Sequence, residues 1–318
     1  MKKVIIPISL LCLIAVFVGI SCSKTYNSKG TVQSLNQLFA DLRTTPQYLS
    51  VTAGRDTVVY GTNGTMLHFY KNSFKDANGN ILTSGTVYLQ LVEMYKAGDM
   101  IRNRATTIAN RQILQSAGEI NITANMNGQT VYTSKYGIGF KQLSASTQPM
   151  ELFYGSNANT DSAITWTQGN NTTPGTTANG TTIDTNGNYA GIYIIFDSCT
   201  GFGWVNCDHF KSTSAPFTNV YAIIADSSFT RENTQLFLIF PAINSQMTLS
   251  SNNTDTFSVW LEGNQVPIGL NYELAVIANK FGNYYYYEQS GVTTSGIAIN
   301  VTMASITKND LITRLSGL

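Results

Sequence analysis

One segment of the 318-residue chain gathers most of its reactive side chains, at Asp197, Cys199, Cys207, Asp208 and His209. Two thiolates, an imidazole and a carboxylate are ligands that zinc accepts, but the cysteines lack the close Cys-x2–4-Cys spacing of common structural zinc sites. On a strand, Cys207 and His209 would share a face, so a thiol nucleophile with an adjacent base is a second possibility. A disulfide between Cys199 and Cys207 is the third.

We predict the disulfide, with no metal and no catalytic site. The chain contains four cysteines, and two of them belong to an N-terminal leader. The remaining two, Cys199 and Cys207, form an even pair, which in an exported protein indicates a disulfide. The bridge would close a small loop with Trp204 packed beneath it, although this indole is also a candidate ligand contact.

Carboxylates on strands are the other chemistry that the sequence offers. Glu93 and Glu119 fall on predicted strands, and two acids about 5–10 Å apart could hydrolyse a glycosidic bond. The sequence has no G-x-S-x-G elbow, no phosphate-binding lysine loop and no H-E-x-x-H helix, and it contains only two histidines. We therefore predict a protein that is not an enzyme and needs no cofactor. A hydrolase of envelope or dietary polymers is the alternative, with acids among Asp197, Asp208, Glu93 and Glu119.

Four consecutive tyrosines, Tyr284, Tyr285, Tyr286 and Tyr287, are the main candidates for ligand binding. Alternate residues of a strand point to opposite faces, so one pair can pack in the core while the other forms an exposed aromatic platform. Such a platform suits sugar stacking or a protein interface. The alternative is an edge strand whose phenols cover a neighbouring sheet.

Three arginines, Arg102, Arg104 and Arg111, form a local basic group. An anionic partner, such as an acidic or sulfated glycan or a phospholipid headgroup, would suit it. A solvated loop explains the same residues, and we favour that interpretation.

The elements that carry these residues are mostly strands. Apolar residues at helical spacing predict one short helix within residues 32–42, after a polar tether, so that residues 23–47 form a tether and helix. From residue 48 to 154 the period changes to two, and turn signals rich in Asn and Gly separate short strands. This pattern predicts an antiparallel β-sandwich.

The second half repeats the β-rich pattern after an interruption. Residues 155–188 are rich in Asn, Thr and Gly and are predicted to be a linker. Residues 189–318 form a second β-rich domain that ends in a short helix at about residues 309–315. The predicted fold class is therefore all-β, with two sandwich-like domains and short peripheral helices.

Two stretches resemble known families. The turn and strands at residues 61–70, 73–79 and 85–93 are similar to the opening of ZU5-like β-sandwich domains. The segment at 202–210, with the pattern GW-x-NCD-x-F, resembles uncharacterised lipoproteins of the Bacteroidota. The resemblance implies an exported β-rich protein and supplies no catalytic residues. ZU5-like domains elsewhere mediate protein contacts, which is an analogy from fold.

The first 22 residues are typical of a lipoprotein signal peptide. Lys2 and Lys3 precede an apolar run at residues 4–18, which is short for a membrane-spanning helix. Small residues then lead to Cys22, a pattern that resembles the lipobox of bacterial lipoproteins, in which the thiol is acylated. We therefore expect a palmitate-type anchor at Cys22 that holds the protein on a lipid bilayer.

Charge excludes one class of partner. The chain has 19 Lys and Arg against 18 Asp and Glu, for a net charge of +1, so it lacks the basic footprint of a nucleic-acid binder. The expected protein is a noncatalytic outer-membrane lipoprotein of the cell envelope, a binding or assembly module that contacts a glycan or an envelope protein. A structural spacer without a ligand is a further alternative, and periplasmic and surface orientations are both open.

Overall fold

The computed structural model describes residues 35–142, 148–156, 164–169, 176–179, 192–212, 214–251, 256–259 and 266–318. Most of these residues lie in strands, and the described α-helices are short: α1 (Leu35–Leu42), α2 (Ala97–Arg102) and α3 (Lys308–Ser316). The all-β prediction is therefore confirmed. The helices expected within residues 32–42 and at 309–315 are present as α1 and α3.

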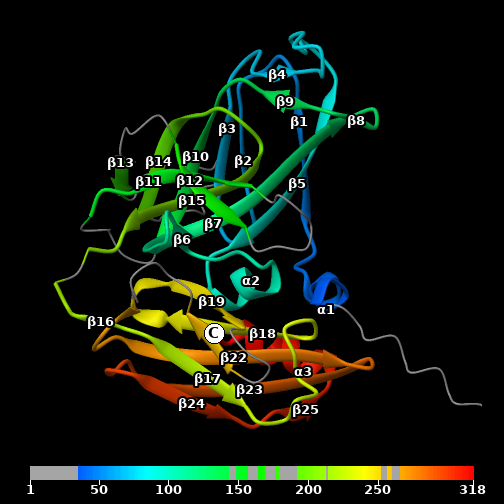
Figure 1. Ribbon diagram of the computed structural model, residues 1–318. Helices are drawn as coiled ribbons and strands as arrows, with labels where there is room; N and C mark the ends of the chain where they lie inside the picture. Colours follow the sequence, from blue (N-terminus) through cyan, green and yellow to red (C-terminus); the bar gives the residue numbers. More distant parts are fainter. Residues whose placement is uncertain are drawn as a thin grey trace, which may run out of the picture. The chain divides into compact units, whose positions relative to one another are not determined.

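Two sheets form a sandwich. The larger sheet has the order β1 (Gln47–Thr52), β5 (Thr86–Met94), β7 (Gln112–Met126), β15 (Gly203–Phe210), β11 (Glu151–Ser156), β12 (Thr165–Gln168) and β6 (Ile108–Ala109), with β8 (Gln129–Thr130) paired to β7. The smaller sheet has the order β13 (Thr176–Asn179), β14 (Ile192–Cys199), β10 (Tyr136–Gln142), β3 (Met66–Phe69) and β2 (Thr57–Tyr60). A separate pair, β4 (Phe74–Lys75) and β9 (Tyr132–Thr133), completes this region (Figure 1).

Strand periodicity builds the core between these sheets. On β5, Val87, Leu89 and Leu91 are fully buried and alternate with residues of the opposite face. Apolar residues of the smaller sheet, including Phe140 and Ile194, belong to the same buried cluster. The two sheets thus bury one face each, as expected for antiparallel strands with period-two hydrophobicity.

The sandwich extends beyond the residues assigned to it from the sequence. Strand β14 pairs with β10, and β15 lies between β7 and β11, so residues 192–210 belong to the same two sheets as residues 47–156. The predicted linker at 155–188 contains β12 and β13, which also join these sheets. Polar loop composition indicates where a strand ends, but it carries no information about which sheet the next strand joins.

The remaining strands form one further eight-stranded sheet. Its order is β24 (Ile297–Val301), β17 (Val220–Ile224), β20 (Thr256–Val259), β19 (Ser245–Ser251), β18 (Thr234–Phe240), β22 (Asn271–Lys280), β23 (Asn283–Val292) and β25 (Ala304–Ile306). A 3-10 turn, η1 (Pro241–Ile243), links β18 to β19, and β16 (Phe217–Thr218) pairs with β21 (Val266–Pro267).

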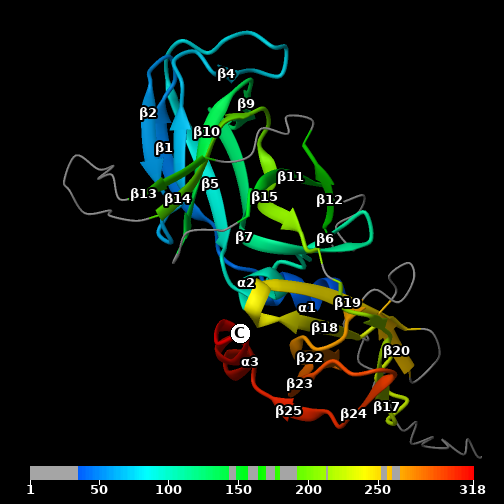
Figure 2. The same ribbon diagram turned by 90° about the vertical axis from the view of Figure 1, so that its left-hand side faces the viewer.

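This C-terminal sheet curls back toward its own edge. Strands β24 and β25 lie at opposite edges, yet only Thr302 and Met303 separate them in the chain (Figure 2). The Tyr287 hydroxyl on β23 also donates to the Asn300 carbonyl on β24, at 3.1 Å. The concave side encloses an apolar core that includes Leu236 and Leu274. Each of the strands β24, β17, β20, β19, β18 and β22 contributes buried apolar residues to this core.

Helices cover the convex side of the C-terminal sheet. Phe237, Ile277 and their neighbours pack with Phe39 of α1, Ile101 of α2 and Leu311 of α3 in one buried cluster. The rings of Phe39 and Phe237 meet edge to face at 6.0 Å. Helix α1 precedes the sandwich in the sequence, so the C-terminal core is completed by an N-terminal segment.

The predicted leader, the tether and the acylation site Cys22 lie outside the described residues. Within the described part, no helix is long and apolar enough to cross a membrane.

Candidate functional site

Cys199 and Cys207 are free thiols, so the structure corrects the predicted disulfide. Cys199 ends β14 in the smaller sheet, whereas Cys207 lies within β15 in the larger sheet, opposite Leu152. Sequence analysis treated the residues between the two cysteines as a loop, but from Gly203 they form a strand that carries Cys207 along the other sheet. Burial raises the pKa of Cys199 to about 12 and raises the pKa of Cys207 as well. Both thiols therefore stay protonated.

The neighbours of Cys207 assemble neither a zinc site nor a nucleophilic pair. His209 contacts the Met150 sulfur at 3.2 Å through Nδ1, and burial lowers the pKa of its imidazole. Asp208 points to the opposite face of β15, and Asp197 is exposed on β14. The described residues contain no group of three His, Cys, Asp or Glu side chains able to hold a metal ion.

The aromatic candidates are engaged in packing. Trp204 is half-buried and packs closely against Gly155. A Cβ atom on residue 155 would lie only 2.7 Å from the Trp204 Cβ. The tyrosine pairs do take opposite faces, as expected: Tyr284 and Tyr286 pack on the helix side, and Tyr285 and Tyr287 pack against the concave core.

All four tyrosines are held by neighbours. The Tyr284 hydroxyl donates to Asp41 at 3.0 Å, that of Tyr286 donates to Glu288 at 2.9 Å, and the Tyr285 ring meets Phe229 edge to face. Because helices cover one side of β23 and the sheet curls around the other, these residues do not form the exposed platform considered above.

Glu93 anchors a turn. Its carboxylate is buried and accepts hydrogen bonds from Gln47 Nε2 at 2.7 Å, from the Asn63 amide at 2.8 Å and from the Thr65 amide at 2.8 Å. Glu93 pairs with Ile120 across β5 and β7, whereas Glu119 pairs with Met94. Paired residues share a face, so Glu93 and Glu119 lie on opposite faces of the sheet and do not form the considered acid pair.

A β-bulge on β7 creates a different carboxyl pair. Asn206 pairs with Glu119 and Asp208 pairs with Ser116, so two residues of β7 oppose the single residue between them on β15. The extra residue is accommodated at Gly118, whose φ is +134°. The bulge brings Ser116 and Glu119 to the face that carries Asn206 and Asp208.

One amide bridges the two acids of this pair. Asn206 Nδ2 donates to Asp208 Oδ2 at 2.5 Å and to Glu119 Oε1 at 3.3 Å, and Ser116 Oγ donates to Asn206 Oδ1 at 3.3 Å. Burial raises the pKa of both carboxyls, and the charge of Asp208 raises that of Glu119 further. Glu119 Oε2 and Asp208 Oδ1 are buried without a hydrogen-bond partner, which favours the neutral form of each carboxyl.

A cavity of about 770 Å³ lies beside this pair and includes Ser116 in its wall. Its other lining residues include the polar Lys96, Asp99 and Gln142 and the apolar Ala117. Glu119 and Asp208 do not line it and are fully buried. A bound molecule would therefore meet Ser116 before either carboxyl.

Two exposed aromatic residues of the sandwich lie on the outer face of its larger sheet. Tyr48 on β1 is 71% exposed and Tyr88 on β5 is 52% exposed. Strands β1 and β5 are adjacent (Figure 1). Tyr48 pairs with Gln90 and Tyr88 pairs with Ser50, so the two tyrosines are diagonal neighbours on these strands. This placement escaped sequence analysis, although the alternation at residues 47–52 and 86–90 carries the signal.

The described strand residues that share this face with the two tyrosines, paired with them or next along the strands, are uncharged. We call this surface the tyrosine face and define it as Tyr48, Ser50, Thr52, Thr86, Tyr88, Gln90, Thr123, Asn125 and Thr130. Every member is exposed or half-buried. Phenol rings, hydroxyls and amides thus share one open sheet surface.

The sequence was compared with protein-family models and with curated proteins. No protein-family model matches the chain, and no curated protein matches its sequence.

Proposed function

We propose that the protein is a noncatalytic module that binds a neutral glycan through the tyrosine face. The observation that carries the proposal is the pair of exposed rings, Tyr48 and Tyr88, set diagonally on adjacent strands among uncharged hydroxyl and amide side chains. The sequence had pointed to a glycan or an envelope protein, and the composition of this face favours the glycan.

The chemistry of the face matches that of a neutral sugar. An exposed phenol ring offers a flat apolar surface to the C–H groups of a pyranose and keeps a polar edge for water or a hydroxyl. Ser50, Gln90 and Asn125 supply both hydrogen-bond donors and acceptors, as sugar hydroxyls require. An acidic glycan would call for Lys or Arg, and the nine residues include neither.

Placement on strands favours an extended ligand. Tyr48 and Tyr88 project from paired strands whose opposite faces contribute Val51, Val87 and Leu89 to the buried core, so their backbones are fixed before binding. Two diagonal rings on a flat sheet can contact successive units of one polysaccharide chain. A backbone that is fixed before binding reduces the entropy lost on binding, which favours affinity.

Affinity electrophoresis of the full-length chain tests the proposal. We expect gels containing a neutral β-glucan, mannan or xylan to retard the wild type, and Tyr48→Ala and Tyr88→Ala each to reduce the retardation. Tyr132→Ala removes a tyrosine that is 51% exposed on β9, outside the tyrosine face, and serves as the matched control. Equal retardation of all four proteins, or no retardation in any neutral polysaccharide, would contradict the proposal.

The same proposal includes an anchor. The leader and lipobox-like residues at 1–22 support export and acylation at Cys22, which would hold the module at the outer membrane of the cell envelope. Metabolic labelling with an alkyne-bearing palmitate analogue should modify the wild type and leave Cys22→Ala unlabelled. Equal labelling of both proteins would refute this part.

A hydrolase is the second candidate, and one observation favours it. Glu119 and Asp208 are bridged by a single amide beside a cavity, with the raised pKa values that an acid catalyst needs. Their full burial opposes the idea, because neither carboxyl contacts the cavity. Loss of polysaccharide turnover in Glu119→Gln and Asp208→Asn, with retained binding, would favour the enzyme over the binding module.

A further inference from the structure

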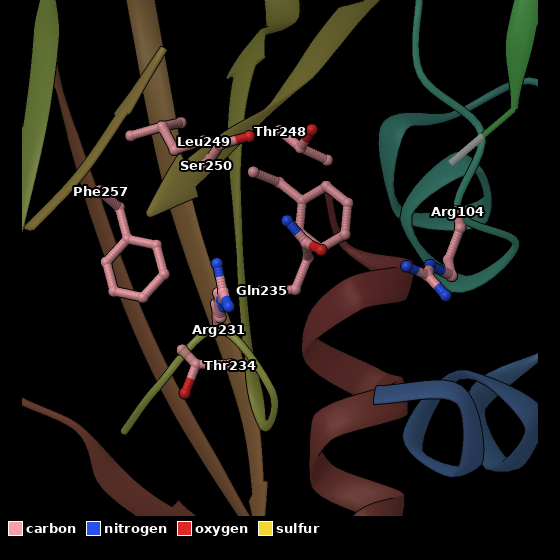
Figure 3. A pocket seen from close by; sticks show the side chains of 9 residues that line it. Arg104, Arg231, Thr234, Gln235, Thr248, Leu249, Ser250 and Phe257 are labelled. Carbon is pink, nitrogen blue, oxygen red and sulfur yellow. The ribbon is translucent and has the colours of Figure 1, made fainter. Parts of the chain in front are cut away.

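A pocket on the C-terminal sheet combines two arginines with a polar floor. Its volume is about 300 Å³, and residues from both faces of β18 and β19 line it. Its lining includes Arg104, Arg231, Gln235, Thr248 and Ser250 (Figure 3). The pocket lies on a different sheet from the tyrosine face and is independent of the proposed function.

Strand alternation makes the floor polar at this point. Phe237 on β18 pairs with Thr248 on β19, and both point to the side that the helices cover. Gln235 and Ser250 lie two residues farther along their strands and face the same way, whereas Leu236 and Leu249 point into the concave core. The floor therefore offers an amide and two hydroxyls beside the buried ring of Phe237, and Leu249 and Phe257 add apolar lining from the concave core.

The two guanidinium groups come from separate loops. Arg231 lies in the turn before β18, is highly exposed, and places its Nε 3.2 Å from Glu232 Oε1. Arg104 follows α2, donates from Nη1 to Asn36 Oδ1 at 3.0 Å, and lies with its guanidinium carbon 5.0 Å from the centre of the Phe39 ring. Figure 3 shows Arg231 beside Gln235, with Arg104 on another side of the pocket.

We infer that this pocket binds a small oxyanion, a ligand that carries a carboxylate, phosphate or sulfate group. Arginine presents a planar fork of donors that matches the oxygens of such groups, and the hydroxyls of Thr248 and Ser250 add neutral donors. Glu232 is the acid paired with Arg231, and exposed ion pairs of this kind are weak, so an anion can displace it. The net charge of +1 provides little general attraction, so binding depends on local geometry.

Calorimetric titration of the full-length chain tests the inference. Inorganic phosphate, inorganic sulfate and glucuronate are the three probes, each titrated at an ionic strength held constant with sodium chloride. We expect saturable binding of at least one probe, with one site per chain. The probe that binds most tightly identifies the chemistry of the anionic group.

Variants locate the binding. Arg231→Gln should weaken binding roughly tenfold or more, because it removes a charge-assisted donor, and Gln235→Glu should weaken it by repelling the anion from the floor. Arg314→Gln is the matched control, since Arg314 is also exposed and also pairs with a glutamate, Glu288, at 3.1 Å. Circular dichroism checks that each variant is folded.

Two results would overturn the inference. One is the absence of saturable binding for all three probes in the wild type. The other is equal affinity in Arg231→Gln and Arg314→Gln. Affinity unchanged from wild type would show that Arg231 does not bind the anion, and an equal reduction would assign the effect to total charge. The tyrosine variants should bind the anion normally, so failure here and failure of the glycan proposal are distinguishable.

Discussion

At the scale of single residues, the buried carboxyls differ in how they are satisfied. Glu93 accepts hydrogen bonds from two backbone amides and a glutamine, so both of its side-chain oxygens have partners. Glu119 and Asp208 share one amide and each retains an oxygen without a partner. Neither arrangement could be predicted from the sequence, because each depends on which residues face one another across strands.

Glu119→Gln is expected to change the pH dependence of stability. The pKa of Glu119 is raised in the folded state, so the folded protein binds more protons than the unfolded chain once the pH exceeds the unfolded pKa. The wild type should therefore lose stability as pH rises from about 4.5 toward the folded pKa, at up to ~1.4 kcal/mol per pH unit for one proton. The glutamine variant should lose less over this range.

Thermal melts of the wild type and Glu119→Gln at pH 4 and pH 8 measure this effect. The two proteins should be similar at pH 4, and the variant should gain relative stability at pH 8. Glu288→Gln, at an exposed site, is the control. A variant whose melting temperature falls relative to wild type on going from pH 4 to pH 8 would show that Glu119 is ionised in the folded protein.

Glu93→Gln should destabilise the protein. The substitution replaces one acceptor oxygen with an NH2 group that faces backbone donors, so at least one buried amide of the 61–65 turn loses its partner. The expected cost is about 2 kcal/mol in the free energy of unfolding. Urea denaturation measures it against Glu288→Gln, which should change stability little; equal stability of the two variants would contradict the anchoring role.

At the scale of elements, period-two hydrophobicity was a sound guide to strands. Most strands of the sandwich fall where alternation predicted them, as β5 and β7 illustrate. Strand β15 was missed because Cys199 and Cys207 were interpreted as the ends of a disulfide-closed loop, and the structure has neither that loop nor the disulfide. The bulge at Gly118 was also hidden, because a bulge is a property of two paired strands rather than of one sequence.

Gly118→Ala tests the bulge. Gly118 has a left-handed φ, and an added Cβ would lie 2.7 Å from the Tyr95 ring. We expect a loss of about 1–3 kcal/mol, from backbone strain and displacement of that ring. Gly128→Ala is the matched control, because Gly128 also has a positive φ but has no atom within 4 Å of the added Cβ. Chemical denaturation should show the larger loss at Gly118, and equal losses would contradict the steric account.

At the scale of the whole molecule, the sandwich and the C-terminal sheet share buried interactions. Thr107, from the sandwich side, contacts Ser245 and Gln246 of β19. Its Oγ1 lies 2.6 Å from Ser245 Oγ and accepts a hydrogen bond from the Gln246 amide at 2.6 Å. The Thr107 amide donates to the Gln246 carbonyl at 2.9 Å. Helix α1 also completes the convex core. The sequence-based prediction of two domains joined at residues 155–188 did not include these interactions, because composition does not reveal contacts between distant segments.

We therefore expect residues 35–318 to unfold in one transition. Thr107→Val should lower the free energy of unfolding by about 1–3 kcal/mol, since it leaves the buried Gln246 amide without its hydroxyl acceptor. Differential scanning calorimetry should give a single peak for wild type and variant, with the variant shifted to lower temperature. Thr313→Val, at an exposed position of helix α3, should melt close to wild type. Two separated peaks in the wild type would contradict the shared core.

The most direct test of the central claim is the association constant for a neutral polysaccharide. It is measured at 0.05 M and 1 M sodium chloride for three proteins: the wild type, the double variant Tyr48→Ala/Tyr88→Ala and the control Tyr132→Ala. An uncharged, ring-based face predicts wild-type binding that salt leaves nearly unchanged, a loss of roughly tenfold or more in the double variant, and no loss in the control. Binding that salt abolishes, or that survives removal of both rings, would contradict the claim.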